Sequence, residues 1–173
     1  PKNTVKMGVM YTRKLPAPKK SFFLFGPRGT GKTTWLRHCF KKAKFFDLLQ
    51  TNETLKYEKN PEYFRDQVLA LPKSQWIVID EIQKVPVLLD EVHFLMEHYG
   101  YKKFVLTGSS ARKIKRGSAN LLAGRALLVK MFPFNSSEID RDWKEENLIQ
   151  YGMLPLAVLS KTRSDKEDFL HAY

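Results

Sequence analysis

Five short apolar runs alternate along the chain with segments in which apolar residues recur at helical spacing. The first run follows Ser21, extends from Phe22 to Phe25, and closes at Gly26. A run without polar alternation is typical of a strand buried on both faces, as in a parallel sheet. By the same pattern, further strands are expected at 45–49, 76–79, 104–107 and 126–131.

Helical spacing appears in the segments between these runs. The first apolar face contains Trp35, Leu36, Cys39, Phe40 and Ala43. A second helix is expected from Pro61 to about Leu71, because Asn60 can cap it and Pro61 suits its first turn. A third face follows Pro86 and ends at Gly100, with Leu88, Leu89, Val92, Leu95, Met96 and Tyr99. Strands that alternate with helices predict an α/β fold, with a mostly parallel sheet covered on both faces.

Length and composition narrow the class of protein. The chain has 173 residues, 43% of them hydrophobic, which is enough for a real core and excludes disorder as the main state. Cys39 is the single cysteine, so a disulfide scaffold is excluded. No apolar run approaches the roughly 20 residues of a membrane span. The start carries no signal-peptide core, so a cytoplasmic location and no membrane partner are expected.

The chain is strongly basic, with a formal net charge of +12 and a pI near 9.8. This surplus is compatible with nucleic acid, with an anionic ligand such as a nucleotide, or with solubility alone. Composition does not choose among the three.

The segment after the first strand matches the phosphate-loop pattern G-x-x-x-x-G-K-[ST]. Its glycines let backbone N–H groups face phosphates, and the following helix adds its positive end. Lys32 can reach the β- and γ-phosphates, and the Thr33 hydroxyl can bind Mg²⁺. The expected nucleotide-binding residues are Gly26, Pro27, Arg28, Gly29, Thr30, Gly31, Lys32, Thr33 and Thr34.

An acidic pair closes the 76–79 strand. Asp80 lies 48 residues after Lys32, at the carboxyl end of a strand, where a carboxylate can contribute to a Mg²⁺ site. Glu81 could then orient the attacking water. The alternative is a pair of acids that merely faces solvent.

Other polar residues carry weaker signals. Ser109 or Ser110, after the fourth strand, can contact the γ-phosphate or the water, although Gly and Ser are also ordinary turn residues. Arg125 can act as an arginine finger, usually on a neighbouring subunit, or can be a solvated surface residue.

Two further groups of residues do not point to a functional site. The basic run 112–116 lacks interleaved aromatic residues, so a solvated loop is favoured over a nucleic-acid contact. His93 and His98 are five positions apart, which does not place them on one helix face as metal ligands.

Taken in order, these segments resemble AAA+ P-loop ATPases, and more closely the prokaryotic AAA-domain ATP-binding proteins that carry a C-terminal domain of unknown function. The resemblance runs from about residue 10 to the end. It is carried by 26–34, the Asp-Glu-Ile-Gln-Lys-Val-Pro segment 80–86, Leu-Thr-Gly-Ser-Ser at 106–110, Leu-Ala-Gly-Arg at 122–125, Phe-Pro-Phe at 132–134, Ser-Glu-Ile at 137–139 and Tyr-Gly-Met-Leu-Pro at 151–155.

The resemblance implies a three-layer P-loop NTPase fold with sheet order 5-1-4-3-2. It implies that ATP and Mg²⁺ are the ligands. Lys32 would bind phosphate, Thr33 and Asp80 would hold the metal, and Glu81 would be the catalytic glutamate. Ser109 or Ser110 would be the polar sensor, and Arg125 the candidate arginine finger of a homo-oligomer.

The residue pattern and the resemblance together predict three segments. Residues 1–20 are a basic lead-in, 21–136 the ATPase core, and 137–173 a helical lid or linker stub. Family members usually continue well beyond this length, so a truncated protein that lacks an effector domain is expected.

Three functions compete at this stage. The leading one is a Mg²⁺-dependent ATPase whose nucleotide state drives a conformational change in a further domain or partner. The alternative is a nucleotide-dependent nucleic-acid-binding module with little turnover. A small-molecule phosphotransferase would also need a phosphate loop, but the acidic pair and the Thr-Gly-Ser-Ser turn favour attack by water. No guanine-reading Asn-Lys-x-Asp motif is present, which favours ATP.

Overall fold

The structure is a computed structural model that describes residues 12–109, 122, 124–139 and 145–172. Its described residues divide into two compact units. One contains 17–28 and 32–131, with the sheet, and the other contains 12–16, 29–31 and 132–172. No helix in the described residues is long and apolar enough to cross a membrane.

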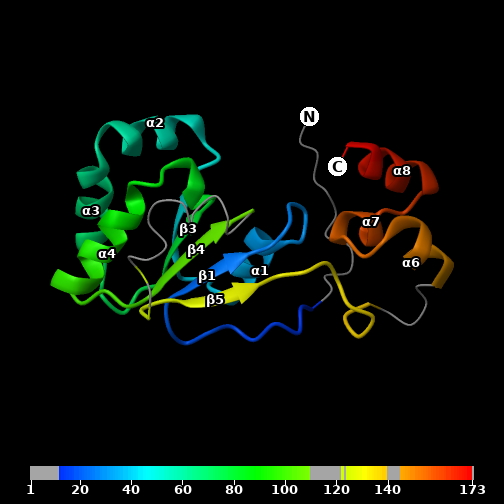
Figure 1. The fold of residues 1–173 in the computed structure, drawn as a ribbon, viewed down its shortest axis with the longest axis horizontal. Coiled ribbons are helices and arrows are strands. Elements are labelled where there is room, and N and C mark those ends of the chain that lie inside the picture. The colour runs from blue at the N-terminus through cyan, green and yellow to red at the C-terminus, as the bar shows by residue number, and fades with distance from the viewer. Residues whose placement is uncertain (1–11, 110–121, 123, 140–144, 173) are drawn as a thin grey trace. The chain divides into compact units, whose positions relative to one another are not determined.

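The first unit is built on a five-stranded sheet in the order β2-β3-β4-β1-β5 (Figure 1). The strands are β1 (Phe22–Phe25), β2 (Lys44–Asp47), β3 (Ile77–Asp80), β4 (Phe104–Gly108) and β5 (Leu127–Lys130). Every neighbouring pair is parallel, and the register pairs Leu24 with Thr107 and Asp47 with Asp80. The expected α/β fold and the order 5-1-4-3-2 are therefore confirmed.

Helices connect the strands, and the structure adds one that the sequence pattern did not predict. The helices are α1 (Lys32–Cys39), α2 (Thr51–Lys59), α3 (Pro61–Leu69), the 3-10 turn η1 (Ile82–Lys84) and α4 (Leu88–His98). In α2 only Tyr57 is buried, so its sequence carries almost no apolar periodicity. The second strand ends at Asp47 rather than at 49, because the Asp47 carboxylate accepts a hydrogen bond from the Leu49 N–H (3.0 Å) and turns the chain.

Alternate side chains of the strands pack on opposite faces of the sheet. Phe23, Ile77 and Ile79 belong to the main core cluster, together with buried residues of α2, α3 and α4. On the other face, the Phe22 ring contacts Trp35 of α1 (centroids 6.3 Å apart) and Phe40 (5.9 Å). The sheet therefore has helices on both faces, and its strands hold α1 directly behind the phosphate loop.

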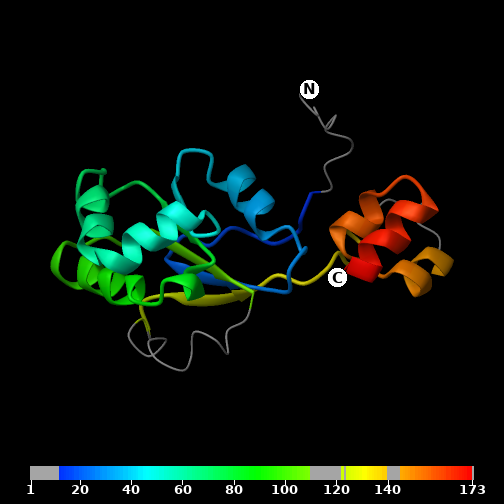
Figure 2. The same ribbon diagram turned by 90° about the horizontal axis from the view of Figure 1, so that it is seen from above.

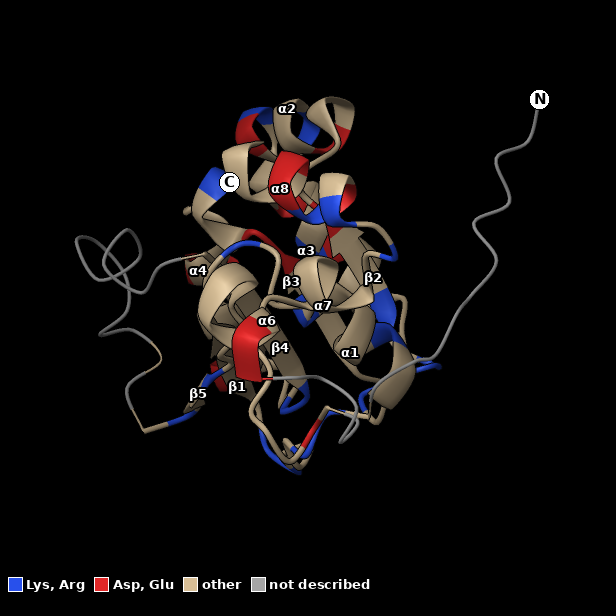
Figure 3. Cartoon of the chain, turned by 90° about the vertical axis from the view of Figure 1, so that its right-hand side faces the viewer, with Lys and Arg blue, Asp and Glu red and all other residues tan. Residues whose placement is uncertain are grey.

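The second unit contains the short helices α6 (Glu145–Tyr151), α7 (Pro155–Leu159) and α8 (Arg163–Ala172), drawn in orange and red in Figure 2. The Phe134 N–H donates to the Met153 carbonyl (2.8 Å), and the Arg13 guanidinium lies over the Phe134 ring, 4.7 Å from its centroid. Acidic residues gather on α6 and α8 (Figure 3).

Candidate functional site

The phosphate-loop pattern lies between β1 and α1, as the motif requires. Gly29 and Gly31 have φ angles of 77° and 85°, in the left-handed region that residues with a side chain adopt at a cost. The helix begins at Lys32, so its unpaired N–H groups lie at the end of the loop. This geometry suits a polyanion, because the helix N-terminus adds partial positive charge.

Lys32 is almost fully buried, with 6% of its surface exposed. Its ammonium donates hydrogen bonds to the carbonyl oxygens of Gly26 (2.8 Å) and Pro27 (3.0 Å). Burial lowers the pKa of Lys32, while the nearby carboxylates of Glu81 and Asp80 oppose that shift. The Lys32 ammonium is therefore a desolvated cation next to the loop, where it can bind a phosphate.

Asp80 joins the loop to the sheet. Its Oδ2 accepts a 2.7 Å hydrogen bond from the Thr33 hydroxyl. Its Oδ1 accepts a hydrogen bond from the Thr107 hydroxyl, on the neighbouring strand β4. Asp80 is 3% exposed and Thr107 is completely buried, so both bonds are shielded from water.

Glu81 follows at the end of β3 in an unusual backbone conformation. Its φ of 60° and ψ of 48° are left-handed, and no other non-glycine residue among the described ones has a positive φ. Such a residue costs roughly 1–3 kcal/mol and persists only where its surroundings enforce it. Here the Glu81 N–H donates to the Thr107 hydroxyl oxygen (3.0 Å). The chain leaves the strand at this residue and enters the 3-10 turn η1.

Gln83 lies in the 3-10 turn beside this carboxylate. Its side-chain amide donates a hydrogen bond to Glu81 Oε2. The Gln83 Oε1 atom is buried and has no hydrogen-bond partner within the described part of the chain. The amide is therefore held mainly through the Glu81 carboxylate.

The other predicted site residues differ in how far they are buried. Thr30 is fully buried in the loop, whereas Pro27, Arg28 and Thr34 are exposed. Ser109 is half-buried directly after β4, the strand that carries Thr107. Ser110 and the basic run 112–116 lie outside the described residues.

Arg125 does not join this cluster in its own chain. It is exposed, forms an ion pair with Glu97, and precedes β5 at the amino end of that strand. The phosphate loop follows the carboxyl end of β1, which runs parallel to β5. A finger role for Arg125 would therefore have to be exerted on another subunit.

Sequence reasoning missed two residues of the site. Thr107 carried a signal, since it is a polar residue in an otherwise apolar strand, but the sensor role was assigned to the serines after it. Gln83 could have been noticed only as an amide two positions beyond Glu81. Its direction depends on the left-handed turn at Glu81, which no propensity predicts.

The donor set suits a hard divalent cation beside phosphates. Thr33 supplies a hydroxyl and Asp80 a carboxylate, oxygen ligands of the kind Mg²⁺ prefers. The described residues contain no cluster of three or more His, Cys, Asp or Glu that could hold a metal by itself. Mg²⁺ sites in phosphate-binding enzymes need few protein ligands, because water and phosphate supply the others.

Comparison with known proteins gives one family match. The family model described as "AAA domain" matches residues 18–140, which is more than two thirds of the chain. No curated protein matches significantly.

Two solved structures are among those that are similar. One is described as "Replication initiator DnaA bound to AMPPCP and single-stranded DNA", at a TM-score of 0.47 and 18% identity over 88% of this chain. The other is PCH-2 of C. elegans, at a TM-score of 0.44 and 17% identity over 64% of this chain. This chain spans 50% of the first protein's length and 34% of the second's.

Proposed function

The chain belongs to the AAA domain family of P-loop ATPases, and from this premise we propose that it binds ATP with Mg²⁺ at residues 26–33 and hydrolyses it. The observation that carries the proposal is the hydrogen bond between Thr33 and Asp80. It brings the phosphate loop and the acidic end of β3 together, although 47 residues separate them. Nucleotide binding and water activation need both elements in one place.

The loop residues bind and orient the triphosphate. Backbone N–H groups of the loop, to which Pro27 contributes none, face the phosphates. Lys32 exchanges its contacts with the Gly26 and Pro27 carbonyls for the β- and γ-phosphate oxygens. Thr33 and Asp80 hold the metal. When bound, Mg²⁺ neutralises the charge that develops on the phosphates.

Glu81 orients and polarises the attacking water. Gln83 keeps its carboxylate in place through one oxygen, which leaves the other free to accept from water. Thr107 stabilises the backbone turn by accepting the hydrogen bond from the Glu81 N–H. Ser109 lies two residues after Thr107, where its hydroxyl can reach the γ-phosphate or the water.

Two parts of the proposal concern assembly. Arg125 is exposed at the amino-terminal end of β5, whereas the phosphate loop lies at the carboxyl end of the strands. It would therefore act as an arginine finger only in a homo-oligomer, on the neighbour's nucleotide. Hydrolysis would be coupled to a conformational change in a further domain or partner, as the helical segment 137–173 is the proposed lid or linker. Turnover per subunit that rises with protein concentration, and that falls in Arg125→Ala, is the expected sign of such an assembly.

The decisive experiment compares the wild type with Glu81→Gln. The variant keeps the side chain's shape but removes the carboxylate. We expect unchanged ATP affinity in Mg²⁺ and loss of steady-state phosphate release, because only the chemical step needs the base. Wild type that binds ATP without releasing phosphate above background would disprove hydrolysis by this chain. Wild type that does not bind ATP would disprove the site itself.

A further inference from the structure

Lysines lie at the amino-terminal ends of four of the five strands, where the chain enters the sheet. Because all five strands are parallel, the segments that lead into them meet at one edge. We call the following set the basic edge: Lys19 and Lys20 before β1, Lys41, Lys42 and Lys44 at β2, Lys73 before β3, and Lys102 and Lys103 before β4.

The segments that carry these lysines contain no acidic residue, and the nearby Glu97 is paired with Arg125 at the entry of β5. The segments 17–21, 40–44, 70–76 and 99–103 contain neither Asp nor Glu. Seven of the eight lysines are exposed and Lys103 is half-buried. Within the described ranges none of the eight forms an ion pair, whereas Arg125, which enters β5, is paired with Glu97. The basic edge is therefore a concentration of exposed lysines without ion pairs among the described residues.

The strand order turns these lysines into a row. In the sheet the order is β2, β3, β4, β1, so the four lysine-bearing entries are consecutive neighbours. Strands lie roughly 4.8 Å apart, so the row extends over about 14 Å. That length matches about four nucleotides of a strand in a DNA duplex, at about 3.4 Å each.

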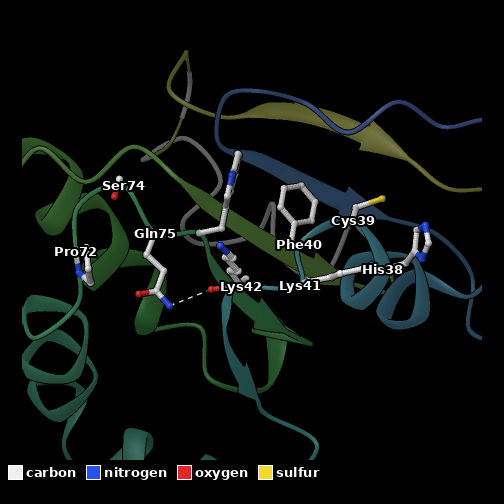
Figure 4. Close-up of a pocket in the computed structure, with 10 residues that line it drawn as sticks. His38, Cys39, Phe40, Lys41, Lys42, Pro72, Ser74 and Gln75 are labelled. Carbon is white, nitrogen blue, oxygen red and sulfur yellow. Dashed lines mark hydrogen bonds between the residues drawn. The ribbon is translucent and has the colours of Figure 1, made fainter.

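A pocket of about 800 Å³ opens in this same edge (Figure 4). One wall is formed by 38–43, the end of α1 and the residues after it, and the other by Pro72 and 74–76 before β3. Gln75 joins the two walls, since its amide donates to the Lys42 carbonyl (3.1 Å). The half-buried Trp76 lines the pocket and packs edge-on against Phe40, with ring centroids 4.8 Å apart. Cations, hydrogen-bonding groups and an aromatic ring thus line one hollow.

We propose that the basic edge binds nucleic acid through its sugar-phosphate backbone, at the end of the strands opposite the phosphate loop. A row of lysines supplies the sequence-independent contacts that dominate such binding. Ser74 and Gln75 can hydrogen-bond sugar or phosphate, and Trp76 places an aromatic ring in the lining where an unstacked base could contact it. A nucleic acid supplies a partner for each of these groups: phosphates for the lysines, sugar or phosphate oxygens for the amide, and a base for the ring. The surface is separate from the ATP site and needs none of its residues.

The test measures binding of one fluorescent oligonucleotide, as a single strand and as a duplex, by anisotropy at several salt concentrations. We expect Lys41→Glu/Lys42→Glu to raise Kd about tenfold or more. The slope of log K against log salt should flatten by about 1.4 for the single strand, at roughly 0.7 per lost phosphate contact. Lys19→Glu/Lys20→Glu, on another strand, should act in the same direction. Melting temperature and ATP binding show that each variant is folded.

The matched control is Lys59→Glu/Lys161→Glu, which changes the net charge equally at two exposed lysines that do not belong to the basic edge. It should leave the slope nearly unchanged. Equal losses in the control and the edge variants would overturn the proposal, since net charge alone would then govern binding. Absent or salt-independent binding by the wild type would overturn it too, as would binding to anionic vesicles of phosphatidylserine and phosphatidylcholine without binding to either oligonucleotide.

Discussion

The Thr33 hydroxyl donates a 2.7 Å hydrogen bond to Asp80 Oδ2, and so ties the first turn of α1 to the carboxyl end of β3. Asp80 is buried, and its other oxygen accepts from Thr107 on β4. Two hydroxyls therefore share one carboxylate, one from the phosphate loop and one from the sheet. Four predictions depend on this arrangement and on the residues beside it.

The first prediction concerns the loop hydroxyl. Thr33→Ala removes a metal ligand and the bond to Asp80, so turnover should fall by about tenfold to a hundredfold, equivalent to about 1.5–3 kcal/mol for a hydrogen bond to a charged group. The Mg²⁺ concentration needed for half-maximal turnover should rise. Phosphate release measured across a Mg²⁺ titration checks both. Thr33→Ser keeps the hydroxyl and should behave nearly as the wild type; a serine variant as poor as the alanine variant would contradict the proposed ligand role.

The second prediction assigns a positioning role to Thr107. Thr107→Val keeps the shape but leaves Asp80 Oδ1 and the Glu81 N–H without their partner, at about 1–3 kcal/mol for each buried group left unsatisfied. We expect a lower melting temperature and a lower kcat with little change in ATP affinity. Thr107→Ser should recover both properties. If the valine variant lost stability yet retained the wild-type kcat, Thr107 would be a purely structural residue.

The third prediction tests whether Gln83 holds the base in place. Gln83→Ala removes the amide that binds Glu81 Oε2, so the carboxylate gains rotational freedom and kcat should fall, by roughly the tenfold that a hydrogen bond of about 1.4 kcal/mol represents. KM for ATP should stay the same, because the side-chain amide of Gln83 donates to Glu81, which is not one of the proposed nucleotide-binding residues. Steady-state kinetics separate the two constants. Gln83→Glu puts a second negative charge against Glu81 and should be at least as slow; an unchanged kcat in both variants would refute the positioning role.

The fourth prediction follows from the burial of Lys32. Burial lowers the pKa of this ammonium in the folded protein, whereas the unfolded chain keeps an ordinary lysine pKa. Between the two values the unfolded state binds more protons, so this group makes stability rise with pH. Lys32→Met should remove that rise and should stabilise the ligand-free protein at neutral pH.

The same variant should lose the response to ATP. In the wild type, ATP at a hundred times its Kd should contribute about 2.7 kcal/mol, which raises the melting temperature by roughly 5–10 °C for a chain of this size. Thermal melts with and without Mg²⁺·ATP over a series of alkaline pH values provide both measurements. A methionine variant that melted below the ligand-free wild type, with an unchanged pH slope, would show that the buried charge is well compensated in the fold.

Local patterns in the sequence were sufficient for the five strands and for the phosphate loop. Short, mostly apolar runs marked the five strands. The phosphate-loop pattern from Gly26 to Thr33 requires a loop between a strand and a helix, which is where it lies. The polar helix α2 escaped this reasoning, because a single buried residue produces no periodicity. The sheet order came from the family resemblance, since strand spacing carries no information on which strands are neighbours.

What the sequence determined by itself is therefore the α/β architecture and the identity of the chemical groups: a lysine and a hydroxyl after β1, and two acids after β3. The tertiary structure decided which of them meet. The order β2-β3-β4-β1-β5 places Thr107 beside Asp80 and gathers lysines from four separate connections into one row. The parallel direction of β5 leaves Arg125 at the end of the strands opposite the phosphate loop. These relationships depend on crossovers between strands distant in sequence, and on which way each side chain points, so no local pattern encodes them.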